Sequence, residues 1–232
     1  MSVKRVLACA MCACFLCCLS FAGDVASFAD IGFSEDGRVY IFGQYGKTDV
    51  TFKPWAEIFA VDVAANQYVK GEVFKYNEEN CDVSGKAAYD SLKTKSEWKL
   101  AKYHAAPAGS ETLLYLRTDE GKGAQDEIVF KDFEAEGNGS SYHVKLVPTF
   151  RGTGKTCQSK FYIDVSKQDE NGSVTKAFKA GTPDFERKGV TGYLIEKIFT
   201  DKSGKSLVFV VKKTVEDDTG KSIRYMVETY RL

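Results

Sequence analysis

The sequence predicts a mainly β fold: antiparallel meanders in stacked sheets, propeller-like or forming a β-sandwich, with one amphipathic helix near 86–104. Three observations carry this prediction. Short runs rich in Val, Ile, Phe and Tyr recur along the chain, as expected of strands. Gly turns such as Glu35-Asp-Gly37 and Gly137-Asn-Gly139 separate many of these runs and supply the positive φ of tight hairpins. Only 86–104 repeats its apolar residues at helical spacing.

Twelve strands are expected in chain order. They lie at 27–33, 38–45, 56–64, 69–76, 111–117, 127–133, 142–150, 159–165, 174–178, 192–199, 206–213 and 222–231. In the last of them, apolar residues such as Ile223 and Val227 alternate with charged ones such as Glu228. A strand with this alternation has one face in solvent or lies at the edge of its sheet.

The helix is predicted between the fourth and fifth strands. Ala88, Leu92 and Leu100 share one face of it, and good helix formers dominate the segment. No Gly or Pro interrupts residues 86–104, whereas Pro107 follows and ends the helical pattern.

The two ends of the chain repeat one pattern, in which a polar Gly turn leads into an apolar strand. The first copy has the turn Ser34-Glu-Asp-Gly-Arg38 before strand residues 39–42, and the second has Asp201-Lys-Ser-Gly-Lys205 before 207–210. Both strands are apolar on both faces. Such strands must be covered on both sides, either by stacked sheets or by a sheet and a helix.

This turn-and-strand pattern resembles one blade of a TolB-type β-propeller over about 35 residues at each end of the chain. Four complete four-stranded blades would need sixteen strands, which is more than the twelve expected. A β-sandwich therefore stays open beside an incomplete propeller.

A second resemblance extends over essentially the whole chain after residue 22. The segments that carry it are Gly23-Asp-Val-Ala-Ser27, Gly32-Phe-Ser-Glu-Asp-Gly37, Phe42-Gly-Gln-Tyr-Gly46, Trp55-Ala-Glu-Ile58 and Ile223-Arg-Tyr-Met-Val-Glu-Thr229. On these segments the chain resembles the predicted secreted bacterial proteins of domain-of-unknown-function family 2259. The resemblance implies export, and it implies no reaction, ligand or site residue.

Residues 1–22 predict a secretory signal peptide. Lys4 and Arg5 precede an apolar run of about 16 residues, and Ala22 is a small residue suited to cleavage after it. The run is shorter than the roughly 20 residues of a membrane-spanning helix, although an uncleaved anchor is the alternative. Five cysteines in this segment leave lipid attachment as a further alternative. We expect residues 23–232 to form a single domain in the periplasm or outside the cell, with no transmembrane span.

Charge and cysteine content limit the possible partners. The chain has 32 basic and 32 acidic residues, and loss of residues 1–22 removes two basic ones, which leaves a net charge of −2. The sequence has no basic block of the kind that binds nucleic acid, so nucleic acid is not expected as a partner. Cys81 and Cys157 would remain, as a candidate disulfide in an oxidising compartment or as two separate thiols.

The usual signatures of catalysis and cofactor binding are missing, so we expect no cofactor. The two histidines, His104 and His143, cannot build a multi-histidine metal site. The acidic turns Asp169-Glu-Asn-Gly172 and Asp217-Asp-Thr-Gly220 are weak calcium candidates, because each lacks the full loop pattern and its distal Glu. Hairpin turns are the alternative for both.

These features favour an exported, non-enzymatic β domain that binds a protein or a glycan in the cell envelope. Trp55, after Pro54 at a strand entrance, and Tyr45, at a strand exit, are the candidate exposed contacts, and packing beneath the loop 46–54 is the alternative. Two other functions stay open: a periplasmic small-ligand or calcium-binding protein, and a secreted hydrolase that uses carboxylates.

Overall fold

The computed structural model describes residues 24–118, 127–134 and 139–232. The N-terminal sheet is a meander of β1 (Ser27–Phe33), β2 (Val39–Lys47), β3 (Pro54–Asp62) and β4 (Gln67–Asn77). The outer sheet has the order β10 (Arg187–Lys188), β8 (Gln158–Gln168), β7 (Ser141–Arg151) and β6 (Ile128–Lys131), with β9 (Val174–Ala180) also paired to β8. The central sheet has the order β13 (Gly220–Arg231), β12 (Ser206–Asp217), β11 (Val190–Thr200) and β5 (Leu113–Leu116).

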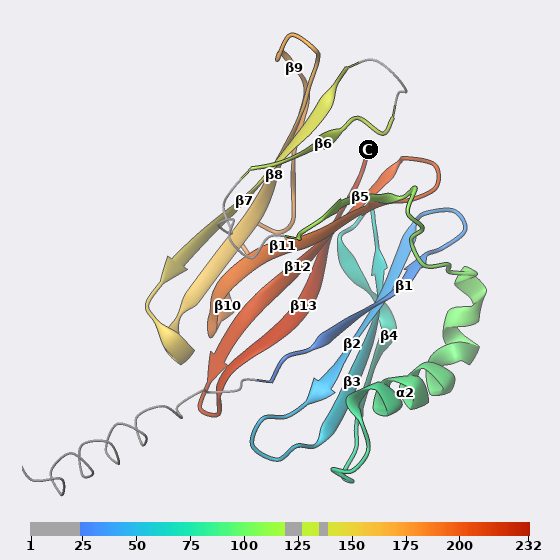
Figure 1. Cartoon of the computed structure of the whole chain (residues 1–232), viewed down its shortest axis with the longest axis vertical. Helices are drawn as coiled ribbons and strands as arrows, with labels where there is room; N and C mark the ends of the chain where they lie inside the picture. Colours follow the sequence, from blue (N-terminus) through green and yellow to red (C-terminus); the bar gives the residue numbers. More distant parts are fainter. Residues whose placement is uncertain (1–23, 119–126, 135–138) are drawn as a thin grey trace, which may run out of the picture.

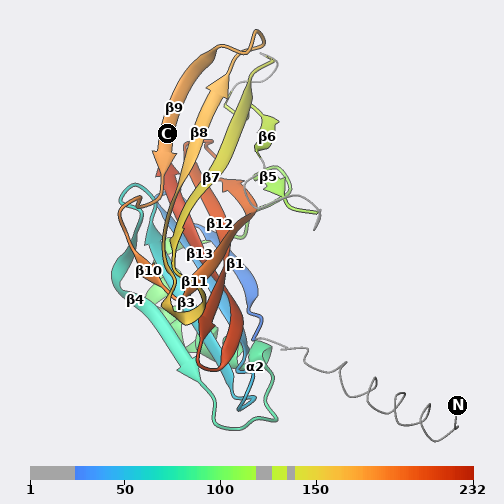
Figure 2. The same cartoon turned by 90° about the vertical axis from the view of Figure 1, so that its left-hand side faces the viewer.

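The sheets and the helix α2 (Gly85–Leu100) form four layers (Figure 1). One apolar cluster joins the outer and central sheets, a second joins the central and N-terminal sheets, and a third joins the N-terminal sheet to α2. The β8–β9 hairpin stands at one end of the long axis, with α2 toward the other (Figures 1 and 2). The prediction of a mainly β fold in stacked antiparallel sheets is confirmed.

The two strands that are apolar on both faces are covered on both faces. Phe42 packs toward the central sheet, whereas its neighbour Ile41 packs toward α2. In β12, Phe209 faces the outer sheet and Val208 faces the N-terminal sheet. Both kinds of cover therefore occur: a sheet and a helix around β2, and two sheets around β12.

Each of the twelve predicted strands overlaps an observed strand. The short β10 was not predicted, because its two residues carry no periodic pattern. The predicted helix is α2 together with a 3₁₀ turn, η1 (Ala101–Tyr103). It begins after Ser84, whose hydroxyl accepts a hydrogen bond from the Ala87 amide and so caps the first turn.

The sheets are not arranged as successive propeller blades. The sheet built from the C-terminal strands lies between the other two, so the layers do not follow chain order (Figure 1). The resemblance to TolB-type blades is therefore not shown. The fold is a stack of three antiparallel sheets, as in a β-sandwich with one additional sheet.

Strand β13 lies at an edge of the central sheet, as its alternating pattern predicts. The start of the described chain lies beside it. Val25 forms a parallel bridge to Ile223, and the Ala26 amide donates to the Ile223 carbonyl at 3.1 Å. In the described ranges, no helix is both long and apolar enough to cross a membrane.

Candidate functional site

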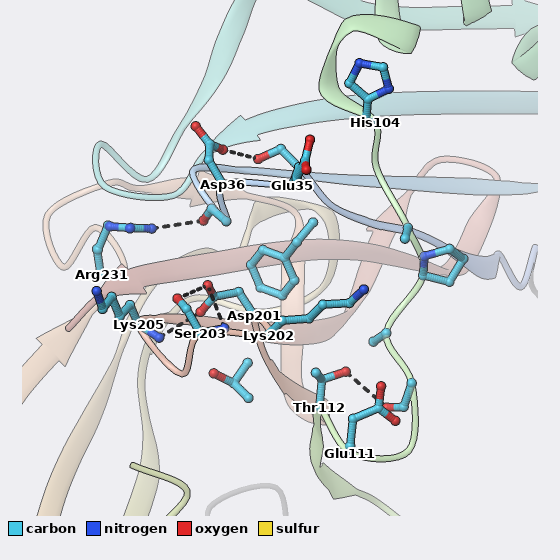
Figure 3. A pocket seen from close by; sticks show the side chains of 18 residues that line it. Glu35, Asp36, His104, Glu111, Thr112, Asp201, Lys202, Ser203, Lys205 and Arg231 are labelled. Atoms are coloured by element: carbon cyan, nitrogen blue, oxygen red, sulfur yellow. Dashed lines mark hydrogen bonds between the residues drawn. The ribbon is translucent and has the colours of Figure 1, made fainter.

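A cavity of about 760 Å³ opens where the two repeated turns meet. We call it the turn pocket (Figure 3). The β1–β2 turn supplies residues 33–37, and the β11–β12 turn supplies residues 200–205. The irregular segment from His104 to Thr112 closes one side, and Arg231 of β13 lies at another.

Hydrogen bonds hold the two turns together. Ser206 Oγ donates to the Gly37 carbonyl at 2.8 Å, and the Arg231 guanidinium donates to the same carbonyl at 3.1 Å. Gly37 has φ +66°, and a Cβ at this position would lie 2.4 Å from Oδ2 of Asp201. Glycine is therefore required here both for the turn and for the close approach of the second turn.

Two of the carboxylates at the pocket hold their own turns. Asp201 Oδ1 accepts hydrogen bonds from the backbone amides of Lys205 and Ser206 at 2.8 and 2.7 Å. Asp36 accepts from Ser34 Oγ at 2.7 Å, and this hydrogen bond is the main cause that holds the pKa of Asp36 below its usual range. These carboxylates stabilise local structure and are occupied there.

Other charged groups at the pocket are unpaired. The side chains of four residues, Glu35, Glu111, Lys202 and Lys205, make no hydrogen bond or ion pair within the ranges that the structure describes. Figure 3 shows that they come from both turns and from the segment before β5. The pocket therefore offers charges of both signs to a ligand.

Thr200 adds a buried polar group to the pocket wall. Its residue is only 5% exposed, and its Oγ1 has no hydrogen-bond partner among the described residues. A buried, unsatisfied hydroxyl costs about 1–3 kcal/mol. A ligand that bonds to it would recover part of this cost.

The backbone of His104 is strained beside the pocket. Its φ of +47° lies in the left-handed region, which a residue with a Cβ seldom adopts. The strain lets the chain leave η1 and run along the mouth of the pocket. Strained residues of this kind concentrate at functional sites.

The two predicted exposed contacts do not lie on the turn pocket. Trp55 is 6% exposed; its Nε1 donates to Asp24 Oδ2 at 3.1 Å, and the Arg224 guanidinium lies 4.3 Å from its ring. The predicted exposure of Trp55 is not found, because Asp24 and Arg224 of β13 cover it. Tyr45 is half-buried and stacks on Tyr89 of α2 at 5.1 Å. Both side chains are therefore packed against other residues, which is closer to the alternative than to exposed contacts.

Both cysteines lie outside the strands and are free thiols. Cys81 is exposed after β4, where its thiol donates to the Thr51 carbonyl at 3.3 Å. Cys157 is buried just before β8, and its carbonyl accepts from the Gly189 amide at 2.7 Å. The structure thus does not form the candidate disulfide.

Thiol labelling checks this arrangement. A maleimide reagent on the folded, processed protein is expected to modify Cys81 and to leave Cys157 unmodified, because Cys157 is buried. After denaturation without a reductant, both should react. Failure of both thiols to react in denaturant would show that a disulfide forms.

The remaining sequence candidates do not converge on a metal site. Within the described residues, no group of three His, Cys, Asp or Glu side chains is placed to hold a metal ion. Asp169 accepts hydrogen bonds from the amides of Asn171 and Ser173, and Asp217 accepts from the Thr219 amide. These acidic turns are hairpins that use their carboxylates internally.

Sequence reasoning found both turns but not the pocket. The repeat is visible in the sequence, whereas the contact between Gly37 and Ser206 depends on how the N-terminal and central sheets stack. Nothing in the sequence marks Thr200 as a site residue, since threonine is common at strand ends.

A comparison with known protein families finds a match, which extends over most of the chain. Residues 41–231 match the family described as "Predicted secreted protein (DUF2259)". No curated protein matches the chain. The match begins within β2 and extends to the end of β13, so it includes the β11–β12 turn of the pocket but not the β1–β2 turn. On this match, the chain belongs to the DUF2259 family of predicted secreted proteins.

Proposed function

We propose that residues 23–232 form one exported, non-enzymatic binding domain, whose turn pocket holds a charged segment of a partner protein in the cell envelope. The family description as predicted secreted proteins supports export. The predicted signal peptide, residues 1–22 with cleavage after Ala22, lies outside the described residues. The fold includes the chain from Asp24 onward, so cleavage there would leave every described residue in place.

One observation carries the proposal: a buried hydroxyl without a partner lies in the wall of a cavity that also presents unpaired charges. Thr200 supplies the hydroxyl, Glu35 and Glu111 supply negative charges, and Lys202 supplies a positive one. Pockets that bind ligands place a few polar groups of this kind at fixed positions.

The lining favours a protein segment over a glycan. The single Phe, Tyr or Trp among the lining residues is Phe33, which is buried and offers no open ring face for a sugar to stack on. A peptide supplies side chains of both charges and backbone groups that can bond to Thr200. A glycan partner is an outcome that the experiment below distinguishes.

The test is site-specific photocrosslinking in the native envelope. A photoreactive amino acid at Lys202, on the pocket, is expected to give one discrete adduct with a protein. The same residue at Lys179, exposed on β9, is the matched control and should not give that adduct. A protease-resistant adduct that a glycosidase removes would indicate a glycan instead. Absence of any adduct specific to Lys202 would contradict the proposal.

Thr200→Val tests the hydroxyl itself. The substitution keeps the shape of the side chain and removes an unsatisfied polar group, so the free energy of unfolding should rise by about 1 kcal/mol. The Lys202 adduct should nevertheless decrease several-fold. Urea denaturation and quantified crosslinking measure the two effects.

Thr229→Val is the matched control, because Thr229 is equally buried but its hydroxyl donates to the Val63 carbonyl at 2.9 Å. It should lower the free energy of unfolding by about 1–2 kcal/mol and leave the adduct unchanged. If Thr200→Val destabilised the protein as much as Thr229→Val does, the Thr200 hydroxyl would have a partner in the folded chain.

A further inference from the structure

A second cavity, about 610 Å³, opens at the β13 edge of the central sheet. We call it the basic cleft. It lies between the β3–β4 turn at residues 66–68, strands β12 and β13, and the segment 182–188 around β10. It shares no lining residue with the turn pocket.

Positive charge is in excess in the cleft. Arg187, Lys188 and Lys213 line it, together with the single carboxylate of Glu228. Glu228 is 3% exposed at its side chain and is already bonded, to the Arg187 guanidinium at 3.1 Å and to Asn66 Nδ2 at 2.5 Å. Burial raises the pKa of Glu228, and the Asn66 and Arg187 contacts oppose that rise.

Lys213 differs from these paired groups. It lies on β12 and is half-buried, and its ammonium makes no hydrogen bond or ion pair within the described part of the chain. Burial is the main cause that lowers the pKa of Lys213; the Arg187 charge lowers it further, and the Glu57 charge opposes this only in part. A cation held in this way, next to a second cation, is stabilised by an anion from outside the chain.

The walls of the cleft suit an apolar body attached to that anion. Val190, Val215 and Met226 form part of the lining. Tyr68 and Phe185 also line it and are 50% and 57% exposed, although the Tyr68 ring stacks on Phe59 with 5.0 Å between ring centroids. The Arg187 guanidinium lies 4.8 Å from the Phe185 ring, which keeps this ring beside the cationic groups.

We propose that the basic cleft binds a small organic carboxylate with an aromatic or branched apolar body, and that the carboxylate bonds to the Lys213 ammonium. The volume is within the range of sites for small molecules. Arg187 remains with Glu228 and adds to the positive potential, while Tyr68 and Phe185 contact the apolar body. This site is independent of the turn pocket and would belong to a different ligand.

Calorimetric titration with 4-phenylbutanoate tests the proposal, with the neutral 4-phenylbutanamide as the matched ligand. The carboxylate is expected to bind the processed, folded protein at least about 10-fold more tightly than the amide, since charge-assisted hydrogen bonds are the stronger ones. Lys213→Met should remove this preference, whereas Lys213→Arg should retain part of it. Lys212→Met is the control: Lys212 directly precedes Lys213 on β12 and does not line the cleft, so this substitution should leave binding unchanged.

Chemical footprinting gives a readout that does not depend on a variant. An amine-acylating reagent should modify Lys213 faster in the free protein than in the presence of 4-phenylbutanoate, while Lys212 should react equally in both. Equal affinity for the carboxylate and the amide, or no protection of Lys213, would overturn the proposal. Detection of neither ligand at millimolar concentration would also overturn it.

Discussion

Gly32→Ala is expected to lower the free energy of unfolding by about 3–5 kcal/mol. Gly32 lies at an irregularity in the β1–β2 pairing, with φ +110°. A Cβ built there would lie 1.6 Å from the Ala106 carbonyl oxygen, which is backbone and cannot rotate away. The substitution therefore adds a steric conflict to a strained φ. It should also displace the segment after η1 and deform the turn pocket.

Gly172→Ala separates these two costs. Gly172 has φ +81°, but no atom lies within 4 Å of the position of its Cβ. Its substitution should cost about 1–2 kcal/mol, from backbone conformation alone. Urea denaturation of both variants measures the difference. Equal losses would show that β1 and the 104–112 segment are not in contact as described.

Phe209→Ala is expected to lower the free energy of unfolding by about 3–5 kcal/mol. Phe209 is completely buried on β12, in the cluster that joins the central and outer sheets. Both neighbouring layers are sheets whose backbones are hydrogen-bonded, so the cavity left by the ring cannot collapse easily. Loss of this contact should loosen the outer sheet in particular.

Trp98→Ala is the matched control for removal of an aromatic ring. Trp98 is on α2 and is 78% exposed, so its loss should change stability by less than about 0.5 kcal/mol. Thermal and urea unfolding measure both variants, and hydrogen exchange locates the change. Phe209→Ala should speed exchange in β7 and β8. Uniform exchange in all three sheets would contradict a separate outer layer.

The local structure was predictable because it depends on neighbouring residues. The apolar runs and Gly turns predict every strand except β10, and the uninterrupted helix formers predict α2 with η1. The same reasoning predicts that residues 39–42 and 207–210 need cover on both faces. It does not predict which layer covers which face, because that depends on contacts between segments far apart in the sequence.

The site residues were less predictable for the same reason. Trp55 follows a proline at the start of a strand, a position that allows exposure, and it is buried through Asp24 and Arg224, which are distant in sequence. Lys212 and Lys213 are adjacent and identical in type. Strand alternation places them on opposite faces, but the sequence does not show which of the two faces a cavity.

The central sheet has a consequence for the order in which the molecule is assembled. Strands β11, β12 and β13 come from the last part of the chain, yet they separate the N-terminal sheet from the outer sheet. Until residues 190–231 are available, each of the other two sheets has an apolar face without cover. A chain that emerges N-terminus first can therefore complete the cluster between the N-terminal sheet and α2 early, but it can complete neither cluster of the central sheet until nearly its last residue has emerged. Loss of β13 alone would leave β12 as a new edge and Val25 without its partner strand.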